Sequence, residues 1–463
     1  MAVYPLAGLP RQGQIWSWMS YDVANQSFTL LINTLLFSLF FTQVVVTDES
    51  RSATMWSLMY AASMLLTVVI SPIAGAIADE RGWKKLGMLA TGMGCAVLTC
   101  LFGLIPAGGL WIAVLLYIPA NCLYSLGENF LSSFLPELCE REQFGKVSGF
   151  SWGVAYFAAL VLLGLTAAGM IAMRLESPDQ WRPFFVFAGI WFAIFTLPTL
   201  VFLKERPAAR SAVAMSLWTV GFVRLGRTVR EVGRFRDLAI LLVASMFYGT
   251  AMSVVIFFAS ILAEEFGFKA TQLVIFTAVI TVSGVLGTLI PMRFQDRFGH
   301  RRMMVVLLLL WLVTALGLAL VAWLFGRAAD QAAFPRWPVW LVGNFLGFGL
   351  GSLGTANRAF VGYLAPSTRS AEFFGLWGLV FKLAAIGTIP FAVVKDRLGT
   401  PASLLVLAGF VVVGLLLTLF VDERRGVAAA RAADAEAGLM GRVQTIAGPQ
   451  IAVPVLEERA GST

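Results

Sequence analysis

The chain has 463 residues, of which 59% are hydrophobic and only 13% are charged, with a net charge of +8. A soluble domain averages about 25% charged residues, so this composition excludes a soluble globular protein and indicates a chain that folds in lipid. The cations lie at the ends of apolar segments, which favours a role in membrane topology over nucleic-acid binding. We therefore expect membrane lipid, and no nucleic acid, among the partners.

Apolar segments of about 20 residues recur along nearly the whole chain, and each is long enough to cross a hydrocarbon core of roughly 30 Å. Arg11 precedes the first of them without a small-residue cleavage pattern, so we expect this helix to remain in the mature protein. The sequence predicts an all-α polytopic membrane protein with twelve transmembrane helices. The expected helices are 15–46, 54–78, 84–105, 109–134, 146–172, 183–203, 237–263, 270–292, 302–325, 337–362, 372–394 and 399–421.

The lysines and arginines are unequally shared between the two sides of this predicted topology. With the N-terminus inside, the inner segments hold 25 of the 34 cations, the outer loops hold 8, and Lys382 lies within a helix. By the positive-inside rule, this asymmetry predicts that both termini are cytoplasmic. We expect a multi-pass protein of a bacterial inner (plasma) membrane.

Two charged turns follow the second and the eighth expected helix, and their acids, Asp79 and Asp296, are 217 positions apart. A second recurrence links Pro136 and Phe144-Gly145 with Pro366 and Phe374-Gly375, at equivalent places in the two halves. Both recurrences indicate one six-helix unit used twice, as in many secondary transporters. The residues of the two turns are Gly75, Asp79, Arg81, Gly82, Lys84 and Lys85, and Asp296, Arg297, Gly299 and Arg301.

The duplication divides the chain into an N-terminal six-helix bundle (1–203), a cytoplasmic linker (204–236), a C-terminal six-helix bundle (237–422) and a tail (423–463). The tail is rich in Ala, Gly and charge, so we expect it to be disordered and cytoplasmic. The linker carries apolar residues on one helical face and arginines on the other. These are Trp218, Leu225, Val229 and Val232, and Arg224, Arg227, Arg230 and Arg234. Either a basic amphipathic helix on the inner leaflet or a solvated linker helix fits this pattern.

The first turn, Gly-x-x-x-Asp-x-Arg-Gly-x-Lys-Lys within a 6+6 chain, resembles the major facilitator superfamily, and the resemblance covers nearly all of residues 15–422. Further stretches resemble its vacuolar amino-acid effluxer-like branch, also called the unknown major facilitators. These are Tyr21-Asp22-Val23-Ala24-Asn25, Phe134-Leu135-Pro136-Glu137-Leu138, Val147-Ser148-Gly149, Leu203-Lys204-Glu205-Arg206, and Ala371-Glu372-Phe373-Phe374-Gly375-Leu376 with Lys382. The chain departs from the superfamily pattern at Met292, where the second turn lacks its leading glycine. It departs from the branch at Tyr248-Gly249-Thr250-Ala251, where the branch has Tyr-Asn-Asp-Gly.

The resemblance implies a secondary active transporter that moves a small polar or zwitterionic, amino-acid-like solute by alternating access, in the direction of efflux and with proton coupling as an option. Two alternatives remain open. One is a non-transporting sensor, scaffold or assembly factor, which the altered seventh helix favours; the other is an exporter of organic acids, chelators or amphipathic compounds. We expect no enzymatic activity, no cofactor and a functional monomer. His300 is the sole histidine and the cysteines lack paired spacing, so we expect no metal site.

Two polar stripes follow the first and the fourth helix. In each stripe the second, third and fourth residues lie 4, 7 and 11 positions after the first. At 100° per residue, this spacing places all four within about 60° of one another around the helix. The stripes are Asp22, Gln26, Thr29 and Asn33, with Asn25 beside them, and Asn121, Ser125, Glu128 and Ser132. A charged carboxylate facing lipid costs about 2.5–3.5 kcal/mol, so the stripes should face a water-filled cavity or a partner helix. Proton uptake by Asp22 or Glu128, and pairing of Asp22 with a cation near the inner interface, both remain possible.

In the second half, Lys382 lies well inside a predicted helix and Arg358 lies in the inner third of another. A cation there would meet a substrate carboxylate, or would neutralise Asp22 or Glu128 in a structural ion pair. Arg358 is also placed to snorkel to the inner interface. The aromatic residues Tyr248 and Trp377 are candidates for the wall of the substrate site, against the alternative that they only pack.

We interpret the charged turns as a cytoplasmic gate. Asp79, at the end of the second helix, would pair with Arg81 or with donors on a neighbouring helix while the cavity faces outward, and would release them on inward opening. Because Met292 stands in place of a glycine in the second turn, we expect the Asp79 turn to hold the cytoplasmic gate closed more strongly than the Asp296 turn does. Glycines along one side of the tenth helix indicate close helix approach, for sliding or for simple packing. They are Gly343, Gly347, Gly351 and Gly354.

Overall fold

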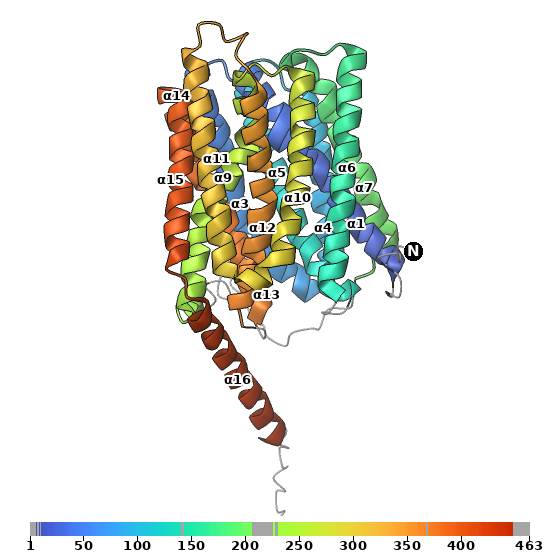
Figure 1. The fold of residues 1–463 in the computed structure, drawn as a ribbon. Coiled ribbons are helices and arrows are strands. Elements are labelled where there is room, and N and C mark those ends of the chain that lie inside the picture. The colour runs from blue at the N-terminus through green and yellow to red at the C-terminus, as the bar shows by residue number, and fades with distance from the viewer. Residues whose placement is uncertain are drawn as a thin grey trace, which may run out of the picture.

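The computed structural model describes residues 6, 9, 11–139, 143–205, 226, 230–366 and 369–447. Within these ranges the chain forms helices and short connections, with no strand. Twelve described helical segments are long and apolar enough to cross a membrane. They stand side by side in one upright bundle (Figure 1). The prediction of an all-α polytopic protein with twelve transmembrane helices is confirmed, with ends that differ by a few residues.

The first six transmembrane segments form the N-terminal half. The first consists of α1 (Gln12–Ser27), η1 (Phe28–Leu35), α2 (Leu36–Phe40) and η2 (Phe41–Val45), and the others are α3 (Ser52–Arg81), α4 (Lys84–Leu101), α5 (Leu110–Leu138), α6 (Phe144–Met173) and α7 (Arg182–Phe202). Short 3-10 turns precede or follow three of them: η3 (Glu49–Arg51), η4 (Phe102–Leu104) and η6 (Pro178–Trp181).

The C-terminal half repeats this order. Its segments are α9 (Arg236–Glu265), α10 (Ala270–Phe298), α11 (His300–Arg327), α12 (Trp337–Leu364), the run α13 (Ser370–Leu383), η8 (Ala384–Gly387) and α14 (Thr388–Leu398), and α15 (Thr400–Leu419). The first segment of each half is the most buried of the twelve. In its most apolar stretch of 18 residues, 78% of the residues are buried in Gln12–Val45 and 67% in Arg236–Glu265. The two duplicated units therefore meet through their first helices at the centre of the bundle.

The first transmembrane segment contains two stretches of π-helix. Phe28–Leu35 and Phe41–Val45 have the wider i→i+5 hydrogen bonding, and Thr34 Oγ1 donates to the carbonyl of Thr29, five positions back, at 2.9 Å. Isolated π-turns in α-helices are frequent at functional sites. Here the longer π-helical stretch carries part of the first polar stripe, including Asn33.

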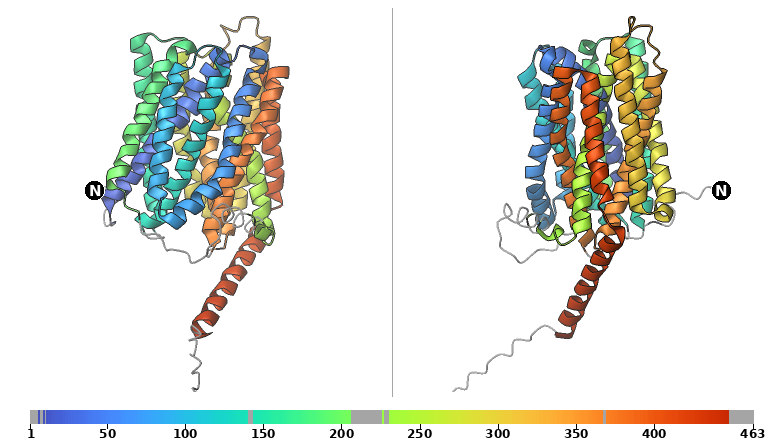
Figure 2. Two further views of the ribbon diagram at one scale, coloured as in Figure 1. Left: turned by 180° about the vertical axis from the view of Figure 1, so that it is seen from behind. Right: turned by 60° about the vertical axis from the view of Figure 1, so that its left-hand side comes forward.

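Both described ends of the chain lie at one end of the bundle. α1 begins there, and the 25-residue helix α16 (Glu423–Ala447) leaves the bundle at the same end (Figures 1 and 2). We call this end the termini side, and the opposite end, with the connection between α11 and α12, the distal side. Polar contacts between the two halves are distributed unequally between these two sides.

The helix α16 differs from the disorder expected for 423–463. Its alanines favour helix, and its start is held by hydrogen bonds to the bundle. Arg425 forms a bidentate ion pair with Asp237 of α9, with both distances at 2.7 Å, and Glu423 accepts a hydrogen bond from the backbone N–H of Arg301. Residues 448–463 lie outside the described part of the chain.

Most of the linker also lies outside the described residues. Most of the expected amphipathic helix falls on 206–225 and 227–229, so Trp218, Arg224, Leu225, Arg227 and Val229 have no described placement, whereas Arg230, Val232 and Arg234 lie within the described residues. At the end of the linker, Glu231 pairs with Arg369, which also binds Glu372 at 2.6 Å. The bond to Glu372 has the larger effect and the bond to Glu231 the smaller; both raise the pKa of the Arg369 guanidinium and keep it charged.

Candidate functional site

Three ionisable side chains from three helices lie at a similar depth in the bundle. Asp22 is ten residues after the start of α1, Glu128 is ten residues before the end of α5, and Lys382 is twelve residues after the start of α13. At 1.5 Å per residue, these positions are about 15–18 Å from the termini-side ends of their helices. Since α13 belongs to the second half, the three residues form a polar level shared by both halves.

The two acids are held by neighbours in the first half. Ser151 of α6 donates its hydroxyl to Asp22, and the side-chain amide of Asn25 donates to Glu128 at 3.2 Å. Glu128 is also close enough to Asp22 and to Lys382 for charge interaction with both. If all three groups are ionised, this level carries one net negative charge.

Lys382 connects the two halves through a short chain of hydrogen bonds. Its ammonium group donates to Asn129 Oδ1 of α5 at 3.1 Å, and Asn129 Nδ2 donates to Ser71 Oγ of α3 at 2.5 Å. Neither Asn129 nor Ser71 is singled out by the sequence analysis. Asn129 follows Glu128 directly, so one helical step turns it by 100° toward α3.

The space around these groups is open toward the termini side. Glu128 and Ser132 on α5 and Arg358 on α12 have exposed side chains, although their helices lie within the bundle. A crevice of about 90 Å³ between α3, α4 and α5 has Ser71, Asn129 and Lys84 among its lining residues. It leads from the level of Lys382 to the start of α4 at the termini side.

The opposite side is closed by bonds between the halves. The donors and acceptors of these bonds lie on α2 and α3 in the first half and on α9 and α14 in the second half. The pairs are Ser38 with Ser260 at 2.8 Å, Trp56 Nε1 with the Phe257 carbonyl at 2.9 Å, and Ser57 with Thr388 at 2.6 Å. Tyr60 also stacks on Phe257, with ring centroids 3.6 Å apart. The structure is therefore a state closed on the distal side.

The polar stripes divide between the open and the closed region. Asp22, Gln26 and Glu128 are partly or fully exposed, whereas Asn33 and Asn121 are buried in a network of their own. Asn33 Nδ2 donates to Asn121 Oδ1 at 3.1 Å, Asn121 Nδ2 to Ser63 Oγ at 2.7 Å, and Tyr117 to Asn33 Oδ1 at 2.8 Å. Solute cannot reach Asn33 and Asn121 in this state, so their part in the pathway stays a prediction.

The two aromatic candidates lie in different surroundings. Tyr248 is fully buried and donates to Asn357 Oδ1 at 2.6 Å, so in this state it packs between α9 and α12 instead of facing the open space. Trp377, partly buried on α13, packs against Phe381, and its indole N–H has no hydrogen-bond partner in the described part of the chain. Its role in the site stays a prediction.

The two charged turns lie at the termini side, at the ends of α3 and α10. Gly82 and Gly299 end these helices with φ values of 66° and 88°, the region that favours glycine. The side chains of Asp79, Asp296 and Met292 lie outside the described part of the structure, so the gate roles given to the acids stay predictions. Of the remaining turn residues, Lys84 pairs with Glu137 at 3.1 Å.

An acid from elsewhere in each half covers the start of the helix that follows each turn. Glu205, after α7, accepts the backbone N–H groups of Lys84 and Lys85 at 2.8 and 3.0 Å. Glu423, after α15, accepts that of Arg301. The first N–H groups of a helix have no partner within that helix, and the helix N-terminus favours negative charge. Both acids satisfy such N–H groups and supply such a charge.

This pair is a third mark of the duplication that the sequence analysis missed. The signal is present in the chain as Phe202-Leu203-Lys204-Glu205-Arg206 and Phe420-Val421-Asp422-Glu423-Arg424. The two acids are 218 positions apart, close to the separation of Asp79 and Asp296.

The chain matches the family described as "Vacuole effluxer Atg22 like" over residues 42–431, which is most of its length. It belongs to this family. Among the relatives of this Atg22-like protein is the "Uncharacterized MFS-type transporter YxiO" of Bacillus subtilis (strain 168), which is 23% identical over 424 residues, 88% of this chain and 94% of that one. "Autophagy-related protein 22-1" of Penicillium rubens is 25% identical over 306 residues, 63% of this chain and 51% of that one. The chain thus spans about half the length of such fungal relatives.

Solved structures share the fold. A mutant form of the nucleoside transporter NupG aligns with a TM-score of 0.67 at 14% identity, covering 88% of this chain and 98% of NupG. The D-xylose-proton symporter aligns with a TM-score of 0.66 at 16% identity, covering 90% of this chain and 99% of the symporter. At these identities the likeness shows the fold alone. Together with the family match, it makes this Atg22-like protein an integral multi-pass membrane protein of the major facilitator type, so the resemblance predicted from the sequence is confirmed.

Proposed function

We propose that this Atg22-like protein is a secondary active transporter that exports a small zwitterionic, amino-acid-like solute by alternating access. One observation carries the proposal: acids of the first half and a cation of the second half lie at one depth, beside a space open to the termini side. A zwitterion would place its ammonium group near Asp22 and Glu128 and its carboxylate near Lys382. An uncharged solute would form neither of these contacts, and a singly charged solute would form only one of them.

The placement of the cations indicates the side from which an exported solute would enter. The termini side carries the charged turns and the linker, where most lysines and arginines lie, so we take it as the cytoplasmic face of a bacterial inner membrane. The family description as an effluxer supports the same direction. A solute from the cytoplasm would then enter the state that the structure shows, and opening of the distal side would release it.

The altered seventh helix does not argue against transport. Gly249 packs against Phe381, and Thr250 Oγ1 donates to the carbonyl of Ala384 at 2.9 Å. These positions therefore serve contacts between α9 and the helix run α13–α14. The departure from the branch pattern thus lies at a packing contact of the second half.

Counterflow in proteoliposomes tests the proposal. Vesicles are loaded with one unlabelled solute, and accumulation of the same labelled solute is followed for neutral amino acids, simple carboxylates and simple amines. We expect accumulation for at least one amino acid, and none for carboxylates or amines of similar size. Lys382→Gln should reduce amino-acid counterflow at least about tenfold, because the carboxylate loses its charged partner.

Lys204→Gln is the matched control, since it removes the same charge from an exposed position at the termini side. It should leave counterflow unchanged. If a folded wild-type protein gives no counterflow for any of the three solute classes, transport of small zwitterions is wrong. If Lys382→Gln and Lys204→Gln behave alike, the assignment of Lys382 is wrong.

A further inference from the structure

The distal end of the eleventh transmembrane segment carries a third copy of the charged turn. Asp396-Arg397-Leu398-Gly399 repeats the order acid, arginine, apolar residue and glycine of Asp296-Arg297-Phe298-Gly299. Gly399 ends α14 with φ of 83°, as Gly299 ends α10 with φ of 88°. The turn thus recurs in sequence and in backbone conformation, but on the opposite side of the bundle from the other two.

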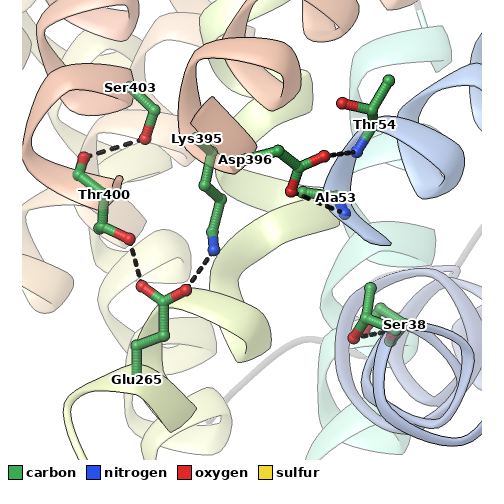
Figure 3. A network of polar contacts seen from close by, with 9 residues as sticks. Ser38, Ala53, Thr54, Glu265, Lys395, Asp396, Thr400 and Ser403 are labelled. Carbon is green, nitrogen blue, oxygen red and sulfur yellow. Dashed lines mark hydrogen bonds and ion pairs between the residues drawn. The ribbon is translucent and has the colours of Figure 1, made fainter. Parts of the chain in front are cut away.

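Asp396 points across to the other half of the protein (Figure 3). Its carboxylate accepts the backbone N–H of Thr54 at 2.7 Å and that of Ala53 at 3.2 Å, at the start of α3. The N–H groups in the first turn of a helix have no partner within it, and the helix N-terminus attracts negative charge. One side chain of the second half therefore satisfies two donors of the first half.

The residues beside Asp396 bind within their own half. Lys395 and Thr400 both bind Glu265 at the end of α9, as Figure 3 shows. These bonds fix the distal end of α14 to α9 and do not involve the first half. Movement of α3 away from α14 would therefore break the bonds of Asp396 and leave those of Glu265 intact.

We propose that Asp396 is the distal gate residue, and that its bonds to Ala53 and Thr54 hold the protein in the state open to the termini side. The inference rests on the alternating access proposed above and adds the contact that sets the balance between its two states. The helices α3 and α13–α14 run antiparallel, and Asp79 lies near the end of α3 where α13 begins at Ser370. Each helix of the pair thus carries an acid at its end, one for each side of the membrane.

A distance measurement between spin labels tests the gate. In a variant lacking the four native cysteines, labels are placed at Ala107→Cys and Ala332→Cys, two exposed loop positions of opposite halves on the distal side. We expect mainly the short distance in this background. Asp396→Asn should raise the ratio of long to short distances roughly tenfold, because a charged acceptor of two N–H groups is lost in the closed state only.

Asp48→Asn is the matched control. Asp48 lies in the loop that leads to α3, and its carboxylate accepts hydrogen bonds from Ser50 at 3.1 and 2.5 Å within that loop. It should leave the distance ratio unchanged, while Asp396→Glu, which keeps the charge, should restore at least part of the short distance. Thermal melting of each variant identifies loss of folding as a separate effect.

Counterflow measured on the same preparations separates this inference from the proposed function. If Asp396→Asn shifts the distances in a protein that transports none of the solutes, the gate contact stands without them. If a folded Asp396→Asn protein keeps the wild-type distances, or if Asp48→Asn shifts them equally, the gate assignment is overturned whether or not the protein transports.

Discussion

At the scale of single residues, Glu128 occupies the central position of the proposed site. It receives a hydrogen bond from Asn25 and lies within charge interaction of both Asp22 and Lys382. Its side chain is exposed. A carboxylate that lies within charge interaction of another acid and of the only cation at this depth among the described residues is the group best placed to exchange a proton for a solute charge.

We expect Glu128→Gln to separate coupling from binding. The amide keeps the shape of the side chain and the acceptor for Asn25, but it cannot take up a proton. Because Asp22 still faces the ammonium group, solute counterflow should remain within about threefold of wild type, whereas accumulation driven by an imposed pH gradient should fall at least about tenfold. The measurement is labelled solute uptake with and without the gradient.

Glu176→Gln, in an exposed loop on the distal side, is the control for loss of a carboxylate. Equal loss of counterflow and of gradient-driven uptake in Glu128→Gln would place Glu128 in solute binding and not in coupling. Gradient-driven uptake that survives in Glu128→Gln would exclude it as the proton site.

The sequence located the acids and Lys382 but not their partners. Helical periodicity places Asp22 and Glu128 on polar stripes, because each stripe depends on one helix only. The contacts of Ser151 with Asp22 and of Asn129 with Lys382 depend on how two helices face each other. Spacing along one chain segment carries no such information, which is why these partners and Asp396 were not predicted.

At the scale of elements, α10 and α12 approach each other closely at their glycines. A Cβ at Gly351 would meet the backbone carbonyl of Gly284, and one at Gly347 would meet Ile280, whereas Gly354 has only the end of Met252 at 3.7 Å. Of the glycines predicted from the sequence, Gly347 and Gly351 therefore serve tight packing in this state, and Gly354 does not. Backbone cannot move aside as a flexible side chain can.

We expect Gly351→Ala to destabilise the protein by about 1–3 kcal/mol, since a methyl group would press against backbone. Gly354→Ala should be neutral or slightly stabilising, because its methyl has room and alanine favours helix. Thermal melting in one detergent checks both variants. Equal melting temperatures for the two would show that α10 and α12 do not pack as closely as the structure has them.

Elements were predicted well where apolar length decides and poorly where the backbone departs from an ordinary helix. The twelve spans follow from hydropathy alone. The π-helical stretches Phe28–Leu35 and Phe41–Val45 leave no such pattern, because their composition is that of any apolar helix. The composition of residues 423–463 predicts disorder, and the helix α16 departs from it because alanines favour helix and Arg425 binds Asp237 of the bundle.

At the scale of the whole molecule, two six-helix halves close the distal side and leave the termini side open. The bonds between the halves on the distal side, among them those of Asp396, Ser57 and Trp56, define this state. A second state requires these bonds to break while the termini side closes. The polar level of Asp22, Glu128 and Lys382 would then face the other side of the membrane.

The most direct test measures both sides of the molecule at once. Spin-label distances are recorded for the distal pair Ala107→Cys and Ala332→Cys, and for a termini-side pair, Lys204→Cys and Arg302→Cys, in lipid nanodiscs with and without a solute active in counterflow. Alternating access predicts opposite changes: one population with a short distal and a long termini-side distance, and another with the two reversed. Distances that never change, or that lengthen on both sides together, would contradict alternating access.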